Sequence, residues 1–138
     1  MENATTKFYA GGFIFDAQTS TVLLHLRDAN TKINPNTWAF FGGGSEENET
    51  PLNCFLREFQ EETGQQLPPE SCQPLRSYFN EKLQTTRHVF YSTAPIATKD
   101  IRLDEGAGFG WLKLDQLDRH PLSDMTKDDL QFFQNTLA

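Results

Sequence analysis

The chain has 138 residues, of which 37% are hydrophobic, and a formal net charge of −7. This length suits a single domain with its own core, so we expect one domain over residues 1–138. The acidic balance argues against a nucleic-acid polymer as partner, because such binding depends on clustered Lys and Arg. The first ten residues lack the pattern of a signal peptide and no apolar run approaches a membrane span, so we expect a cytoplasmic protein. Its two cysteines make neither a disulfide framework nor a zinc motif.

The first third of the chain predicts a β-hairpin, a polar loop and a further strand. Strand patterns rich in aromatic and β-branched residues occur at residues 8–15, 21–26 and 38–41. A turn at residues 16–20 joins the first two, and residues 28–36 (DANTKINPN) form the loop. His25 alternates with leucines on both sides, so we expect its side chain to point away from the core and assign it no catalytic role.

Three glycines, at positions 42–44, precede a predicted amphipathic helix. Thr50 suits the N-cap, Pro51 the first helical position, and Gly64 the position just past the end. Apolar residues recur with helical spacing and predict a core-facing stripe made of Leu52, Phe55, Leu56 and Phe59. A second arc, roughly 120° away around the helix axis, carries three carboxylates, those of Glu58, Glu61 and Glu62.

This acidic arc is unfavourable for an isolated helix. Glu61 and Glu62 lie in the last turn, where the helix dipole disfavours anions by about 0.3–1 kcal/mol each. Like charges at this spacing add a few tenths of a kcal/mol. A divalent cation would turn the repulsion into coordination, because Mg²⁺ prefers carboxylate oxygens together with water and substrate phosphate. The alternative interpretation is a solvated acidic helix face.

The spacing around this helix decides between the two interpretations. Gly43 is followed after five residues by Glu49, and after seven more by the run REFQEETG at residues 57–64. This matches the Nudix box at every fixed position. The departures are Gln65, where the family has a bulky aliphatic residue whose packing Leu67 can supply, and Phe41, where many members have proline. The chain therefore resembles the Nudix hydrolases, specifically the MutT-like members.

The second half of the chain predicts more strands and a closing helix. The predicted strands are residues 75–79, 87–92 and 109–114, and the predicted helices are a short one from residue 115 and a longer one at residues 126–137. Strands, helix, strands and helix in this order do not follow the regular alternation of a doubly wound sheet. They fit a mixed α/β fold, and the resemblance implies the Nudix-type α/β/α sandwich with a mixed β-sheet.

The resemblance also implies a metal site on the acidic arc. It assigns Glu58, Glu61 and Glu62 as metal ligands, joined by the backbone carbonyl of Gly42. Arg57 is adjacent to this face, so we expect it to orient the carboxylates. The three glutamates and the Gly42 carbonyl are expected to bind Mg²⁺, with Mn²⁺ as a possible substitute.

Three further residues receive roles from the resemblance. Arg27, at the end of a predicted strand, is expected to contact substrate phosphates; the alternative is an exposed strand-end arginine. Glu105, in the loop segment EGAGFGW, is expected to act as metal ligand or general base; the alternative is a loop acid without a role. Asp124, in the segment HPLSD, is expected to contact a nucleobase. We expect Trp38 to pack within the fold more readily than to stack on a base.

Together these features imply an enzyme that cleaves a nucleoside diphosphate linked to another moiety. The first expectation is hydrolysis of a nucleoside triphosphate to monophosphate and pyrophosphate, and the alternative is a nucleotide sugar or a dinucleoside polyphosphate. A second alternative is a non-catalytic ligand-binding module of the same fold, against which the complete set of box carboxylates argues. The expected partner is a small nucleotide derivative, with no membrane, and the protein is expected to be a monomer or homodimer.

Overall fold

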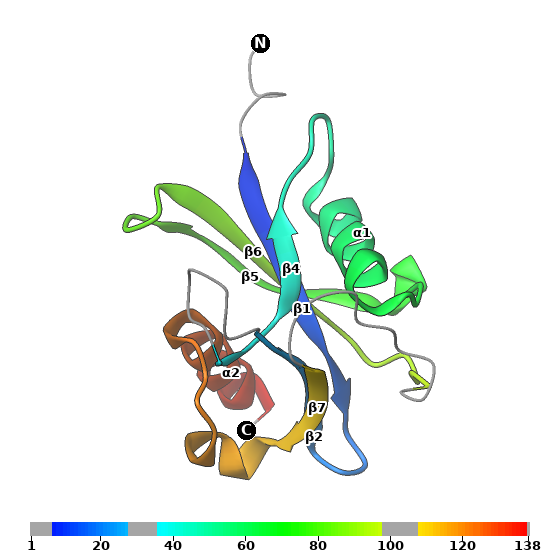
Figure 1. Ribbon diagram of the computed structural model, residues 1–138, viewed down its shortest axis with the longest axis vertical. Helices are drawn as coiled ribbons and strands as arrows, with labels where there is room; N and C mark the ends of the chain where they lie inside the picture. Colours follow the sequence, from blue (N-terminus) through cyan, green and yellow to red (C-terminus); the bar gives the residue numbers. More distant parts are fainter. Residues whose placement is uncertain (1–6, 28–35, 98–107, 138) are drawn as a thin grey trace.

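The computed structural model describes residues 7–27, 36–97 and 108–137, which form a mixed β-sheet between helices (Figure 1). The strands are β1 (Phe8–Asp16), β2 (Thr21–Leu26), β3 (Trp38–Ala39), β4 (Phe41–Gly44), β5 (Cys72–Asn80), β6 (Thr85–Ser92) and β7 (Gly108–Lys113). The α-helices are α1 (Pro51–Thr63) and α2 (Asp124–Leu137), and the 3₁₀ helices are η2 (Pro69–Ser71) and η4 (Leu114–Arg119).

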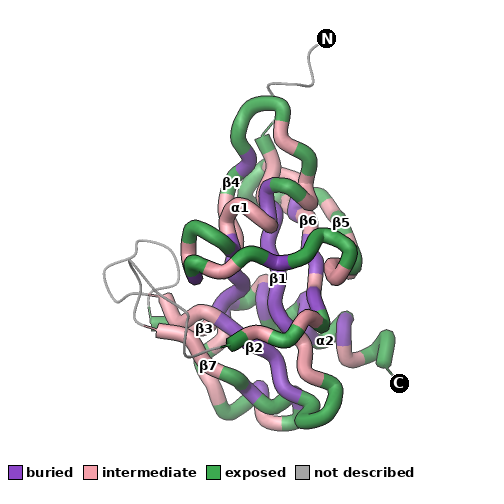
Figure 2. Tube along the Cα trace, turned by 90° about the vertical axis from the view of Figure 1, so that its right-hand side faces the viewer, coloured by how far each residue is buried: buried purple, intermediate pink, exposed green. Residues whose placement is uncertain are grey.

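Strand β1 is the centre of the sheet, and it is buried through its middle (Figure 2). It pairs in parallel with β6 along one edge, and β6 continues antiparallel to β5. The other edge of β1 is shared by two antiparallel partners, β4 in its first half and β2 in its second half. Strand β2 then pairs with β3 and β7. The sheet therefore splits at this edge of β1, because β4 and β2 each pair with a different half of the strand.

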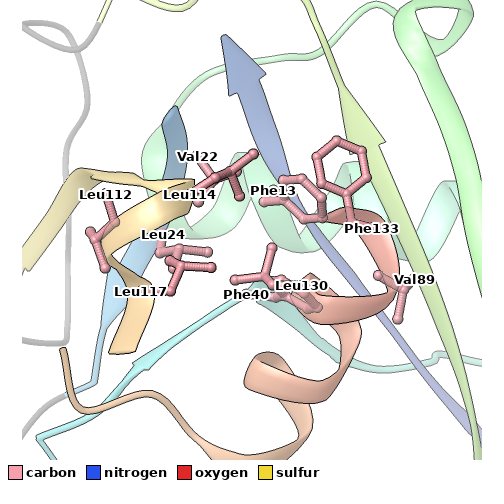
Figure 3. Close-up of a cluster of buried hydrophobic side chains, with 10 residues drawn as sticks. All are labelled: Phe13, Val22, Leu24, Phe40, Val89, Leu112, Leu114, Leu117, Leu130 and Phe133. Carbon is pink, nitrogen blue, oxygen red and sulfur yellow. The ribbon is translucent and has the colours of Figure 1, made fainter. Parts of the chain in front are cut away.

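Alternation along the strands creates two cores, one on each face of the sheet. On β1, Phe13 belongs to one cluster, and Ala10 and Ile14 belong to the other. The first cluster contains Leu130 and Phe133 of α2 (Figure 3), and the second contains residues of α1. The two helices therefore cover opposite faces of the sheet. This confirms the predicted α/β/α sandwich.

The structure moves several predicted boundaries. The strand predicted at residues 38–41 is two strands, and the glycines that follow extend β4, because Gly42 and Gly43 pair with β1. Strand β5 begins earlier than predicted, with an irregularity between Pro74 and Arg76, since proline cannot donate to the ladder. Helix α2 begins two residues earlier, at Asp124.

The prediction that His25 points away from the core is wrong. Its ring stacks on Phe41 with ring centroids 5.6 Å apart, and Phe41 is fully buried. Strict alternation fails here because β2 is covered on both of its faces: Leu23 and Leu24 belong to different clusters and are both buried. In the part of the chain that the structure describes, no helix is long and apolar enough to cross a membrane.

Candidate active site

Helix α1 is held in place by its caps and by its apolar face. The Thr50 hydroxyl accepts a hydrogen bond of 3.2 Å from the Asn53 amide, and Gly64 ends the helix in the left-handed conformation with φ of 77°. Phe55 and Phe59 are fully buried against the sheet, as their spacing predicted. Leu67 is also buried in this cluster, so it supplies the packing that Gln65 cannot. The acidic arc consequently faces the glycines of β4.

Arg57 forms hydrogen bonds both to the loop before α1 and to the acidic arc. Its Nε donates to Glu49 Oε2 at 2.7 Å, and its Nη1 donates to Glu58 Oε2 and to Glu61 Oε1, both at 3.2 Å. The hydrogen bond with Glu49 is the main cause that raises the pKa of Arg57. One cation thus offsets part of the repulsion within the arc and contacts two of its carboxylates.

Glu58 and Glu62 form the half-buried part of the arc, whereas Glu61 is exposed. Burial of the Glu62 carboxyl, followed by the charge of Glu58, raises the pKa of Glu62 to about 9. A hydrogen bond from the Gly42 backbone and the charge of Arg27 act in the opposite direction. Oε1 of Glu62 is buried and has no hydrogen-bond partner among the described residues. A buried carboxylate oxygen without a hydrogen-bond partner destabilises the folded state unless a cation or a proton satisfies it.

This pair fits a divalent cation. Mg²⁺ commonly uses one or two protein carboxylates and takes its other ligands from water and substrate phosphates. Among the described residues, no three His, Cys, Asp or Glu side chains converge closely enough to bind a metal without help. The side chain of Glu61 is 57% exposed and turned toward Arg57, whereas that of Glu58 is 15% exposed. The structure therefore brings together Glu58, Glu62 and the Gly42 backbone, with Glu61 at the outer edge.

A cavity of about 280 Å³ opens on the other side of the β4 glycines. A Cβ at Gly42 would lie 2.8 Å from the Tyr9 hydroxyl, on the cavity side, and a Cβ at Gly43 would lie 2.5 Å from the Glu58 carboxylate. Gly42 and Gly43 therefore lie close to both the cavity and the Glu58 carboxylate. The lining residues are Tyr9, Arg27, Ala39, Phe40, Gly42, Gly43, Asn80, Leu83, Thr85, Arg87, Ser123, Met125 and Thr126.

The predicted substrate residues have different positions relative to this cavity. Arg27 lies in its wall, close enough to influence the Glu62 carboxyl, as a phosphate-binding residue requires. Asp124 is exposed at the start of α2, and its neighbours Ser123 and Met125 line the cavity instead. Trp38 packs against the α2-side cluster and is not among the lining residues. Glu105 lies outside the described residues.

A buried ionic network behind the cavity was not predicted. Asp129 of α2 is fully buried, and its carboxylate accepts hydrogen bonds from Arg76 Nε at 3.0 Å, Tyr78 Oη at 3.0 Å and Arg87 Nε at 2.8 Å. One signal in the sequence points to it: Arg87 shares its strand face with Val89 and Tyr91, a core-facing set. The acidic partner on α2 could be identified only once the fold had brought that helix over β5 and β6.

The family follows from comparison of the whole chain. A family model described as the NUDIX domain matches residues 5–136. The chain belongs to the Nudix family. Membership identifies it as a Nudix hydrolase, a class of enzymes acting on nucleoside diphosphates linked to other moieties. No curated protein gives a significant sequence match.

Solved Nudix structures share this fold at low sequence identity. A mutT/nudix family protein from Listeria innocua matches with a TM-score of 0.77 and 20% identity, over 94% of this chain and 92% of that one. MutT Nudix hydrolase from Burkholderia pseudomallei has a TM-score of 0.73 and 22% identity, over 92% and 97%. The Nudix domain of Shewanella oneidensis NrtR, solved with ADP-ribose, has a TM-score of 0.74 and 17% identity, over 96% and 88%. At these identities the similarity is evidence of a shared fold.

Proposed function

We propose that this Nudix hydrolase uses Mg²⁺, with Mn²⁺ as a substitute, to cleave a nucleoside triphosphate to its monophosphate and pyrophosphate. The observation that carries the proposal is the half-buried pair of Glu58 and Glu62, with one buried carboxylate oxygen unsatisfied by the described residues, beside a cavity whose wall contains Arg27. A cation bound at this pair would polarise a phosphate oxygen and make a water molecule nucleophilic.

The chain's own residues prepare the site for that chemistry. Glu58 and Glu62 supply negative charge on the helix side of the β4 glycines, and Arg57 orients Glu58 through its 3.2 Å hydrogen bond. Arg27 supplies a positive charge on the cavity side, where the polyphosphate would lie. The residue that accepts the proton from water is Glu105 or one of the box glutamates. Glu61 would join the ligand set after leaving Arg57.

The cavity favours one nucleoside over two. Its volume of about 280 Å³ lies just below the range of roughly 300–1,000 Å³ that is typical of pockets for drug-sized ligands. A cavity of this size suits one nucleoside of the substrate, which agrees with a nucleoside triphosphate. The fold shared with the NrtR domain, which was solved with ADP-ribose, keeps a nucleotide sugar as the second candidate. We further propose that the protein acts in the cytoplasm as a monomer or homodimer.

A charge-neutral substitution tests the proposal. Glu62→Gln should lower the metal-dependent rate by roughly a hundredfold or more, because it removes a cation ligand that the fold does not require. Glu47→Gln removes the same charge from an exposed position in the neighbouring loop and should leave the rate unchanged. The measurement is release of pyrophosphate and monophosphate from a panel of nucleotides, with and without Mg²⁺. A rate in Glu62→Gln close to that of the wild type would reject the site.

A further inference from the structure

The cavity contains a buried arginine whose donors are only partly used. The Arg87 side chain is 6% exposed, its Nε donates to Asp129 Oδ2 at 2.8 Å, and its guanidinium lies 4.4 Å above the ring centre of Tyr9. Its two terminal nitrogens make no hydrogen bond to the described residues, although Arg87 lines the cavity. A guanidinium carries several N–H donors, and those that no protein group uses are available to a ligand. A ligand in the cavity is placed to provide them.

The network behind the cavity fixes the direction of these donors. The other oxygen of Asp129 accepts hydrogen bonds from Arg76 and Tyr78 of β5, so the carboxylate is held from two strands. Asp129 in turn holds the Arg87 Nε, and Tyr9 supports one face of the guanidinium. The terminal nitrogens are therefore oriented before a ligand arrives, which reduces the entropy lost on binding.

The acceptors on the other described side chains of the lining are hydroxyls and one amide. None of them is a carboxylate or a histidine. The Asn80 side-chain oxygen already accepts the Leu83 amide at 3.0 Å, and its amide nitrogen contacts the Met125 sulfur at 2.8 Å. The Ser123 hydroxyl donates to Thr126 Oγ1 at 2.8 Å, which leaves the Thr126 hydroxyl free to donate. These side chains suit a ligand edge that carries acceptors.

Nucleobases differ in the hydrogen-bond donors and acceptors that their edges present. Arginine pairs with the carbonyl oxygen and N7 of a 6-oxopurine, whereas the amino group of adenine needs an amide or carboxylate oxygen. We propose that Arg87 is a specificity-determining residue, positioned by Asp129, that binds the carbonyl edge of the substrate base and makes the enzyme prefer 6-oxopurine nucleotides to adenine nucleotides. This inference rests on the proposed function, because it assumes that the cavity receives the base of a nucleotide.

Inosine monophosphate and adenosine monophosphate provide a matched pair of probes. The two differ in the group at purine position 6, and neither contains a phosphoric anhydride bond that the enzyme could cleave. Isothermal titration of the wild-type protein in Mg²⁺ should give about tenfold tighter binding of inosine monophosphate, a typical effect for one arginine pair with a base edge. Equal affinities, tighter binding of adenosine monophosphate, or no binding of either would overturn the proposal.

Two arginine variants separate base recognition from support of the fold. Arg87→Gln should reduce the affinity ratio to below about threefold. Arg76→Gln removes one partner of Asp129 but leaves the Tyr78 and Arg87 hydrogen bonds to that carboxylate in place, and Arg76 does not line the cavity, so this variant should keep the ratio even if stability falls. Arg87→Lys retains the charge and should give an intermediate ratio if Arg87→Gln does not fold. A ratio lost equally in the Arg87 and Arg76 variants would overturn the assignment.

The same titrations distinguish this inference from the proposed hydrolysis. If the protein cleaves nucleoside triphosphates but binds both monophosphates equally, the base assignment fails and the proposed function stands. If it prefers inosine monophosphate but releases no product from any nucleotide in Mg²⁺, the proposed function fails and the assignment of Arg87 stands.

Discussion

Replacing Gly43 with alanine is expected to disable the site without unfolding the protein. A Cβ at position 43 would lie 2.5 Å from Oε2 of Glu58. The carboxylate must then retreat by about 0.9 Å to reach the 3.4 Å at which ordinary van der Waals contact begins. It is the end of a flexible side chain, so the strand can keep its place. Misplacing a group at the reaction centre by about 1 Å costs roughly a hundredfold in rate, or about 2.7 kcal/mol.

Two other glycines supply the controls for this experiment. A Cβ at Gly44 meets nothing within 4 Å, so Gly44→Ala should keep wild-type rate and stability. A Cβ at Gly12 would lie 2.0 Å from the Phe90 carbonyl oxygen, which is held in the β1–β6 ladder, so Gly12→Ala should destabilise the fold by roughly 1–3 kcal/mol or more. The assays are pyrophosphate release in saturating Mg²⁺ and urea unfolding. Wild-type turnover by Gly43→Ala would refute the argument that the position of the Glu58 carboxylate limits the rate.

Three further results are expected. Millimolar Mg²⁺ should raise the melting temperature, because the carboxylate pair that binds it exists only in the folded chain; an unchanged melting curve would contradict this. Asp129→Asn should lower the free energy of unfolding by about 3–5 kcal/mol in urea, since it breaks a buried ion pair, whereas Asp128→Asn, which changes an exposed partner of the same network, should have little effect. Glu105→Gln should lower kcat at unchanged Mg²⁺ dependence if Glu105 is the base, or raise the Mg²⁺ requirement if it is a ligand; behaviour like that of Asp104→Asn would leave it without a role.

The parts of the fold that depend on local sequence were predictable. Helix α1 was predictable because its cap residues, its apolar stripe and its closing glycine all lie within one short segment. The hairpin of β1 and β2 was also predictable, since a turn fixes the pairing of strands that follow one another closely. The contacts of Arg57 with Glu58 and Glu61 follow from its place beside these carboxylates on the same helix.

The parts that depend on distant segments were not predictable. The parallel pairing of β1 with β6 joins residues that the intervening chain separates by about half its length, and no local pattern encodes it. The pairing of Gly42 and Gly43 with β1 was not predicted, because a strand of glycines has no side-chain pattern until its partner is known. The network around Asp129 requires α2 to be placed over β5 and β6, and Arg87 and Asp129 are 42 positions apart.

Cys54 gives the protein a built-in reporter of motion at the active site. Its thiol is fully buried between α1 and β4, 3.7 Å from the Gly43 carbonyl oxygen, and burial raises the pKa of Cys54 to about 12. A thiol-specific reagent can reach it only when the helix separates from the glycine strand, and then only slowly, because the reactive form is the thiolate. The labelling rate of Cys54 therefore counts openings of the contact between α1 and β4. Slower labelling on addition of a cation or a nucleotide would show which of them closes it.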